Sequence, residues 1–267
     1  MDKDCLAPII DGDFIPYRGG FSADTQAKET WGVDGYLEQD YLKWALGNVN
    51  ATMEFLLGVT FKNHPWHKLY IGGSGNYRDT IATTIPSVLP GWKYKGNRDS
   101  LHKPKYFAEI REHLVNRWGA EMVNGRETDD AVSCLQFKYT DRSTCIVSQD
   151  KDLFCCPGQH YNPVDKTWEY TTIKEADLHF RHQTLTGDWS SDYIPGLTGI
   201  AKKTADEILK ECDYDLKAID RKTLQLYNKE FGQQGAAVLR DNQNLLFIQR
   251  QDWRGFSGEE IKWQSTG

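Results

Sequence analysis

The chain has 267 residues, of which 39% are hydrophobic and 26% charged, and its formal net charge is −6. These values are ordinary for a globular protein with room for one sizeable α/β domain and a small helical appendage. No segment approaches the ~18 consecutive apolar residues of a membrane span, and the N-terminus lacks the basic-then-apolar layout of a signal peptide. We therefore expect a cytoplasmic protein that does not engage a membrane.

The six cysteines are scattered along the chain, and none forms a C-x-x-C pair. Two adjacent cysteines make a poor disulfide and a poor zinc clamp, so we predict reduced and mostly buried thiols. They are Cys5, Cys134, Cys145, Cys155, Cys156 and Cys212.

Short apolar runs alternate with longer helical patterns along the chain, which predicts βα units and a mainly parallel central sheet flanked by helices, an α/β fold. Residues 6–10 form the expected first strand, which ends at Asp11-Gly12-Asp13. The apolar residues of 42–57 fit one helical face. A second strand at 69–71 should end in the glycine-rich loop 72–75.

The stretch 78–105 carries six basic residues against two acids, with Trp92 and Tyr94 between them. Basic residues interleaved with aromatic ones suit a strand of phosphates and bases. Taken alone, the stretch is equally well interpreted as a solvated basic loop. Pro104, near its end, should open the next helix at its first position.

The second half of the chain continues the alternation. A helix should start near Asp129, and the β-rich run 144–147 predicts a third strand. Residues 160–173 have the pattern of a hairpin that turns near Asp165-Lys166. From about 183 to 212 the pattern is helix, glycine-rich turn, helix, and the tail beyond is helical.

Acidic residues form the most informative pattern. Asp11 and Asp150 each follow a predicted strand, and ligands of open α/β sheets bind at the carboxyl ends of strands. Four short clusters hold nine acids, and without these the net charge would be +3. The nine are Asp11, Asp13, Glu127, Asp129, Asp130, Asp150, Asp152, Asp188 and Asp192.

Carboxylates in this number repel one another unless cations lie between them, and their hard oxygen atoms select magnesium or manganese. Two such ions about 3.5–4 Å apart can clamp a phosphodiester while an activated water attacks phosphorus in line. Each cluster taken singly is better explained by helix capping or by a turn. Their joint order is the specific signal.

Five motifs in this order resemble those of the 5′ nuclease superfamily, which contains flap endonucleases, polymerase I 5′-nuclease domains and phage 5′→3′ exonucleases. The resemblance runs from about residue 6 to 212, and the short chain without a polymerase region is typical of the free-standing phage type. The motifs are Ile9-Ile10-Asp11-Gly12-Asp13, Tyr94-Lys95-Gly96-Asn97-Arg98, Glu127-Thr128-Asp129-Asp130-Ala131, Ser148-Gln149-Asp150-Lys151-Asp152 and 187–205.

The resemblance implies a 5′-nuclease core over 1–180, which includes an arch or gateway at about 78–105. A helix–hairpin–helix lobe with a helical tail should occupy 181–267. It also implies two Mg²⁺ (or Mn²⁺) ions. The residues expected around the first ion, some through water, are Asp11, Glu127, Asp129, Asp130 and Asp150, and those around the second are Asp152, Asp188 and Asp192.

The resemblance further assigns the basic residues. Lys95 and Arg98 are expected to bind the reacting phosphate and offset its developing charge, and Arg78 is a weaker candidate for the same task. The lobe resembles the family's duplex-holding element, which often also binds K⁺. Glycines permit its tight hairpin, and the next helix start attracts an anion. The DNA-binding residues expected are Tyr94, Gly196, Gly199, Lys202 and Lys203.

Three departures from the family pattern stand out. Gly73 occupies roughly the place of an aspartate that usually follows the second strand, and Asp13 is a candidate substitute. Asp188 and Asp192 are four residues apart rather than three, which leaves open which of them meets the second ion. Tyr193 replaces a usual asparagine.

The predicted function is a 5′→3′ exonuclease that also cuts flaps and acts as a monomer on DNA 5′ ends, flaps and duplexes. If a phage encodes the chain, its place is the host cytoplasm. Two alternatives stay open. One is a 5′ nuclease that prefers RNA primers in RNA–DNA hybrids, and the other is a structure-specific DNA-binding protein whose metal site has decayed, which Gly73 motivates.

Overall fold

The computed structural model describes residues 6–31, 38–81, 85–97, 102–139 and 143–261. Contacts along the chain group it into two compact units. The first unit comprises 1–74, 102–151 and 158–170, and the second comprises 75–101, 152–157 and 171–267. The segment 75–101 thus belongs to the same unit as the C-terminal helices. The sequence analysis instead predicted two continuous domains that meet near residue 180.

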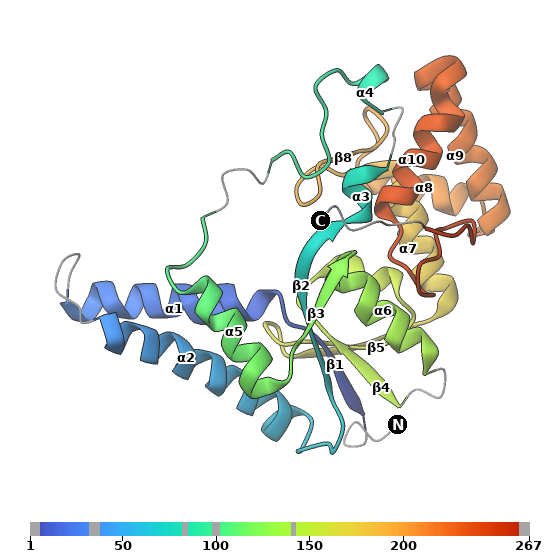
Figure 1. Cartoon of the computed structure of the whole chain (residues 1–267). Helices are drawn as coiled ribbons and strands as arrows, with labels where there is room; N and C mark the ends of the chain where they lie inside the picture. Colours follow the sequence, from blue (N-terminus) through green and yellow to red (C-terminus); the bar gives the residue numbers. More distant parts are fainter. Residues whose placement is uncertain (1–5, 32–37, 82–84, 98–101, 140–142, 262–267) are drawn as a thin grey trace. The chain divides into compact units, whose positions relative to one another are not determined.

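A six-stranded sheet has the strand order β3-β2-β1-β4-β5-β6 (Figure 1). β1 pairs in parallel with β2 and β4, and β4 pairs in parallel with β5, which confirms the predicted parallel-rich α/β fold. The three predicted strands and the hairpin are all present. The bounds are β1 Ala7–Asp11, β2 Lys68–Asn76, β3 Glu121–Gly125, β4 Thr144–Val147, β5 Gly158–Asn162 and β6 Thr167–Thr171.

Two local predictions were wrong. The loop predicted at 72–75 belongs to β2, because the glycines let that strand run close to β3. Pro104 does not open a helix, since α5 begins at Phe107. The Pro104 ring lies against Gly20, where an added Cβ would be 2.5 Å away, and its carbonyl accepts a hydrogen bond from the Phe107 amide in a turn.

The helices of the first unit include one that the apolar pattern did not predict, α1. Its buried stripe recurs every four residues at Ile15, Gly19, Ala23 and Ala27. A Cβ on Gly19 would lie 2.7 Å from Val49, so the small residues allow close packing on α2. The bounds are α1 Phe14–Trp31, α2 Glu38–Glu54, η2 Phe55–Thr60, α5 Phe107–Trp118 and α6 Thr128–Lys138.

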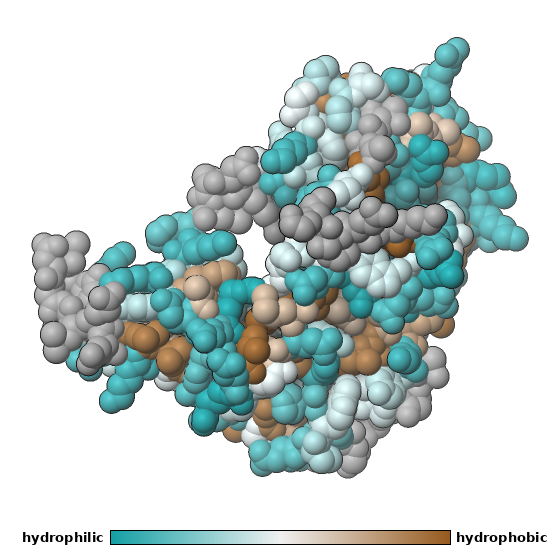
Figure 2. Space-filling model, in the orientation of Figure 1, coloured by the Kyte–Doolittle hydropathy of each residue, from teal (hydrophilic) through white to brown (hydrophobic). Residues whose placement is uncertain are grey.

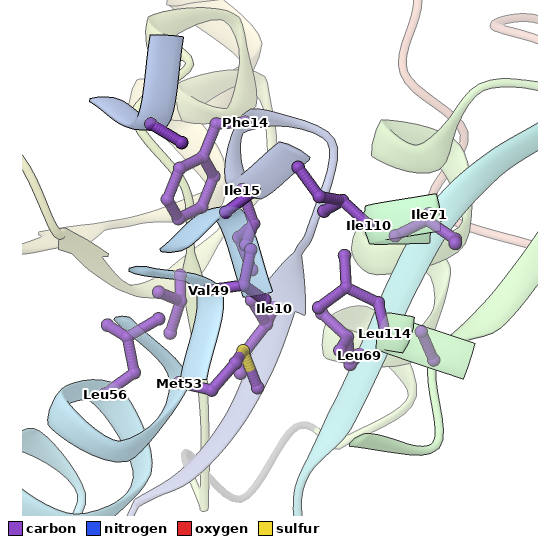
Figure 3. Packing of buried hydrophobic residues seen from close by; sticks show 14 of the residues in the cluster. Ile10, Phe14, Ile15, Val49, Met53, Leu56, Leu69, Ile71, Ile110 and Leu114 are labelled. Carbon is purple, nitrogen blue, oxygen red and sulfur yellow. The ribbon is translucent and has the colours of Figure 1, made fainter. Parts of the chain in front are cut away.

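The core of the first unit lies between the sheet and the helices α1, α2 and α5. Side chains from β1, β2, α1, α2 and α5 pack together there, with Ile10, Met53 and Leu114 at its centre (Figure 3). Each such fully buried side chain contributes about 1.5–3 kcal/mol relative to an exposed one. This packing fixes the carboxyl ends of β1 and β4, where the acids follow.

The second unit is mainly helical and confirms the predicted helix, turn, helix pattern, although α7 begins at Ile173, earlier than expected. Hydrophilic residues cover most of α8 and α9 in Figure 2. The bounds are α3 Tyr77–Thr80, α4 Ile85–Val88, η3 Lys151–Cys155, α7 Ile173–Thr186, β7 Gly187–Asp188, β8 Ile194–Pro195, α8 Lys202–Glu211, α9 Leu216–Phe231, η4 Gly232–Gln234 and α10 Gly235–Leu246.

A buried polar network joins α7, α9, α10 and β8 within the second unit. The Tyr227 hydroxyl donates to the Thr184 carbonyl (2.7 Å), and the Asn242 amide donates to the Tyr227 oxygen (2.8 Å) and to the Pro195 carbonyl (2.6 Å). Because these groups are buried, each bond fixes a helix position that apolar contact alone would leave free to slide.

The five cysteines among the described residues are free thiols, and four of them are buried, as predicted. Cys5 lies outside the described residues. Within the described part of the chain, every helix is too short or too polar to cross a membrane.

Candidate active site

Three of the predicted acids of the first unit line one cavity. Asp11 ends β1, Asp13 follows it, and Asp150 comes three residues after β4, the parallel neighbour of β1. The cavity has a volume of about 570 Å³ and is also lined by Tyr17 and Asp165. The carboxyl ends of neighbouring parallel strands thus bring together acids 139 residues apart, as the sequence predicted.

Asp11 is almost fully buried, with 7% of its surface exposed. Burial, and then the negative charges of Asp13 and Asp150, raise its pKa to about 7. Hydrogen bonds from the Ser148 hydroxyl (2.8 Å) and the Asp13 amide (3.3 Å) oppose this rise. The carboxylate therefore lacks compensating positive charge, which a bound cation would supply.

Asp13 is held by the protein itself. Its carboxylate accepts hydrogen bonds from the Gly72 amide (2.7 Å) and the Thr128 hydroxyl (2.6 Å), and Arg111 lies 3.9 Å away. Arg111 also donates to the Gly72 carbonyl. Asp13 thereby ties the start of α6 to β2, and its role as a substitute ligand stays a prediction.

The predicted Glu127–Asp130 cluster opens α6, which packs against β1. Glu127 is the N-cap residue, but its side chain makes no capping bond. Asp129 and Asp130 lie in the first turn, where negative charge is favourable to the helix dipole. Asp130 is fully buried, which an ordinary surface cap would not require.

Asn124 of β3 fills the space beside Gly73. A Cβ on Gly73 would lie 2.2 Å from Asn124 Oδ1 and 2.6 Å from the Val123 carbonyl oxygen. Asn124 Oδ1 also accepts a hydrogen bond from the Ser74 amide (2.9 Å). An aspartate at 73 would therefore require β3 to shift.

The first-unit acids suit a hard divalent cation by their chemistry, since they offer carboxylate oxygens around a buried group short of positive charge. Across the residues that the structure describes, however, no three histidine, cysteine, aspartate or glutamate side chains surround a single point closely enough to hold a metal ion. Carboxylates that could bind a metal ion thus lie at one edge of the sheet, but among the described residues they do not surround a single ion position.

The three predicted acids of the second unit each have a partner within that unit. Asp152 accepts a hydrogen bond from the Gln183 amide (2.7 Å). Asp188 is buried, and its carboxylate accepts hydrogen bonds from the Ser190 hydroxyl and from the backbone amides of Ser191 and Asp192. Asp192 Oδ2 accepts a hydrogen bond from the Tyr94 hydroxyl (3.0 Å). Their predicted roles as metal ligands stay predictions.

The predicted phosphate-binding residues have contrasting environments. Lys95 is partly exposed, and its Nζ lies 3.4 Å from Asp192 Oδ1. Arg98 lies outside the described residues. Arg78 is only 3% exposed, and its guanidinium donates to the carbonyls of Leu245 (2.9 Å) and Phe247 (2.7 Å). This environment is that of a structural residue, and its catalytic role remains a prediction.

The glycine-rich hairpin of the second unit has the expected close approach, but to its own chain. A Cβ on Gly196 would lie 2.1 Å from the Thr186 carbonyl carbon. Gly199 has a φ of +75°, which favours glycine. Lys202 and Lys203 are exposed at the start of α8, whose N-cap residue provides no side-chain bond. The first amides of α8 are thus free of a side-chain cap.

Several residues of this site escaped the sequence analysis. Ser148 and Thr128 stood inside recognised motifs, yet only the structure shows that they bind Asp11 and Asp13. Glu230 accepts hydrogen bonds from both the amide and the hydroxyl of Thr198, which anchors the hairpin to α9. No local pattern marks that glutamate, because it lies 32 residues from its partner.

No protein-family model matches the chain. It is similar to the flap endonuclease Xni of Edwardsiella ictaluri (strain 93-146), with 31% identity over 139 residues, 46% of this chain and 53% of that protein. It is also similar to the flap endonuclease Xni of Photorhabdus laumondii subsp. laumondii, with 28% identity over 212 residues, 71% of this chain and 76% of that protein. The chain thus spans about half the length of the first relative and about three quarters of the second.

Two solved structures share the fold. The bacteriophage T5 flap endonuclease in a pseudo-enzyme–product complex with DNA and metal ions has a TM-score of 0.61, at 16% identity, covering 91% of this chain and 88% of that one. The T5 5′-exonuclease with bound zinc ions has a TM-score of 0.58, at 17% identity, covering 90% and 89%. Both likenesses extend over nearly the whole chain, so they cover the sheet as well as the C-terminal helices.

Proposed function

We propose that the chain belongs to the 5′ nuclease superfamily and that it is a metal-dependent hydrolase that cleaves DNA phosphodiester bonds. The proposed activities are a 5′→3′ exonuclease and a structure-specific flap endonuclease. The observation that carries the proposal is the gathering of Asp11, Asp13 and Asp150 around one cavity at the carboxyl edge of the sheet.

The relatives support the choice of substrate. Both curated relatives are flap endonucleases, and one of the structural neighbours was solved with DNA and metal ions. The exposed Lys202 and Lys203 at the uncapped start of α8 offer a place for a backbone phosphate. We propose that the second unit binds duplex DNA through this hairpin, with Gly196 and Gly199 in its turn, and that K⁺ binds at the same hairpin.

We propose divalent Mg²⁺ or Mn²⁺, in two ions, as the cofactor. Asp11 and Asp150 would hold the first ion, with Glu127, Asp129 and Asp130 at the adjoining start of α6. When bound, such ions activate water and neutralise charge on the phosphoryl oxygens. The protein's own contribution is to keep Asp11 buried beside two further negative charges, which makes a cation favourable there. Lys95 would offset the charge that develops on the phosphate.

One observation favours a second candidate function, binding of branched DNA without cleavage. Gly73 stands roughly where the family pattern has an aspartate, and Asn124 occupies the space beside it. Six acids of the first unit nevertheless remain at the edge of the sheet or at the start of α6. Cleavage is therefore the stronger of the two candidate functions. If the protein bound branched DNA but did not cleave it, binding without cleavage would become the stronger candidate.

The test is digestion of a 5′-labelled flap substrate with Mg²⁺, with Mn²⁺ and with a chelator. We expect short 5′ products with either ion and none with the chelator. Asp150→Asn should abolish cleavage while it leaves flap affinity nearly unchanged, because the substitution removes charge from the cavity edge but no packing. A parallel arm with an RNA 5′ segment on DNA separates primer removal from DNA cleavage. Tight flap binding without any product would favour the binding-only alternative.

A further inference from the structure

Within the second unit, the basic segment 92–97 lies against the loop 188–193. Three hydrogen bonds join their backbones and side chains. The Lys95 amide donates to the Asp192 carbonyl (3.0 Å), the Trp92 indole to the Tyr193 carbonyl (2.6 Å) and the Asn97 amide group to the Ser190 carbonyl (3.1 Å). These bonds start from the beginning, the middle and the end of the short basic segment.

The Asp192 side chain adds two further contacts to the same segment. Its Oδ2 accepts from the Tyr94 hydroxyl (3.0 Å), and its Oδ1 lies 3.4 Å from Lys95 Nζ. The Tyr94 ring is buried, and the Lys95 ammonium lies 5.2 Å from its centroid. One carboxylate therefore holds both the aromatic ring and the ammonium group beside it.

The backbone is strained on both sides of this contact. Lys95 has a φ of +53° and Tyr193 a φ of +58°, left-handed values that residues other than glycine seldom adopt. Such conformations persist only where the surroundings hold them in place. The hydrogen bonds between segment and loop are the contacts that do so here.

Hydrogen bonds within the loop accompany the orientation of Asp192 toward the segment. Asp188 closes the loop on itself, since it accepts hydrogen bonds from the Ser190 hydroxyl and from the amides of Ser191 and Asp192. With three residues between the two acids, the loop turns and the Asp192 side chain points at Tyr94 and Lys95. Asp188 and Asp192 thus have different partners.

We propose that Asp192 is a positioning residue that docks the basic segment and presents Lys95, rather than a ligand of a metal ion. The catalytic part of this inference rests on the proposed function, in which Lys95 is the phosphate-binding group. Its structural part, the clamp between Asp192 and the 92–97 segment, stands independently of cleavage.

The first test needs no activity. Hydrogen exchange of the peptides that cover 92–97 is measured in the metal-free full-length protein. Asp192→Ala and Tyr94→Phe should each speed exchange there about tenfold, as expected for loss of a hydrogen bond to a charged acceptor. Tyr214→Phe, an exposed tyrosine after α8, is the matched control and should leave it unchanged. Unaltered exchange in Tyr94→Phe, which removes a single oxygen atom, would overturn the clamp.

The second test separates positioning from metal binding. In flap cleavage, Asp192→Asn and Tyr94→Phe should lower kcat by similar factors, about tenfold, and the double variant should be little worse than either single one. The Mg²⁺ concentration for half-maximal rate should stay within about twofold of the unsubstituted protein. A rise of about tenfold or more in Asp192→Asn alone is the result expected of a metal ligand and would overturn the proposal.

The two tests also distinguish this inference from the proposed function. If the unsubstituted protein cleaves no flap with any ion, the proposed function fails, and the exchange measurement still decides whether the clamp exists. If it cleaves and only Asp192→Asn changes the metal requirement, the proposed function stands and the positioning role is refuted.

Discussion

Arg78 offers the sharpest separation between a catalytic and a structural role. It was a candidate for phosphate binding, yet its guanidinium is buried and donates to two backbone carbonyls at and just beyond the end of α10. The perturbations are Arg78→Ala, which removes the charged group, and Arg78→Met, which keeps an apolar stem of similar length. Both leave the Leu245 and Phe247 carbonyls without these donors.

The magnitude follows from the two contacts. Hydrogen bonds to charged groups are worth about 1.5–3 kcal/mol each, so loss of both predicts about 3–6 kcal/mol of destabilisation. This is a large part of the ~5–15 kcal/mol that typically stabilises a domain. Arg78→Met should lose somewhat less than Arg78→Ala, because its longer side chain leaves a smaller cavity at this buried position.

The assay is urea unfolding followed by circular dichroism, alongside flap binding below the unfolding transition. We expect a clear fall in the urea midpoint for both variants and flap affinity within about threefold of the unsubstituted protein while they remain folded. A midpoint that does not move, together with lost cleavage, would refute the structural assignment and restore Arg78 as a phosphate-binding residue.

Three further predictions concern single contacts. Tyr227→Phe removes the hydroxyl of the buried network and should cost about 1–3 kcal/mol in urea unfolding; a change below about 0.5 kcal/mol would contradict it. Gly73→Ala places a Cβ against Asn124 and should cost about 1–3 kcal/mol, partly recovered by adding Asn124→Ala, whereas a stabilised variant would show that β3 yields freely. Glu230→Ala frees Thr198 and should weaken duplex binding about three- to tenfold in fluorescence anisotropy, without loss of helicity; equal affinity would show that the hairpin needs no anchor.

Sequence patterns predicted the elements whose signal is local and strongly apolar. The first strand, the third strand and the helix starting near Asp129 lie where they were expected. α1 was missed because its buried stripe is made of small residues that carry little hydrophobicity, such as Gly19 and Ala23. β2 was cut short because glycines usually mark loops, whereas here they allow a close approach to β3.

The same distinction holds for the candidate site. The convergence of Asp11 and Asp150 could be predicted, since parallel neighbours end at the same edge of a sheet. The engagement of Asp13 could not, because its partners Gly72 and Thr128 lie 59 and 115 residues away along the chain. Spacing alone also could not show that Asp192 faces Lys95, which depends on a left-handed residue in each segment.

The central claim is that the acids at the ends of β1 and β4 form a cation site. Titration of the full-length protein with Mn²⁺, followed by electron paramagnetic resonance of the free ion, tests it without any substrate. We predict saturable binding that Asp11→Asn and Asp150→Asn each weaken by about tenfold or more. Binding that is unaffected by both substitutions would contradict the account.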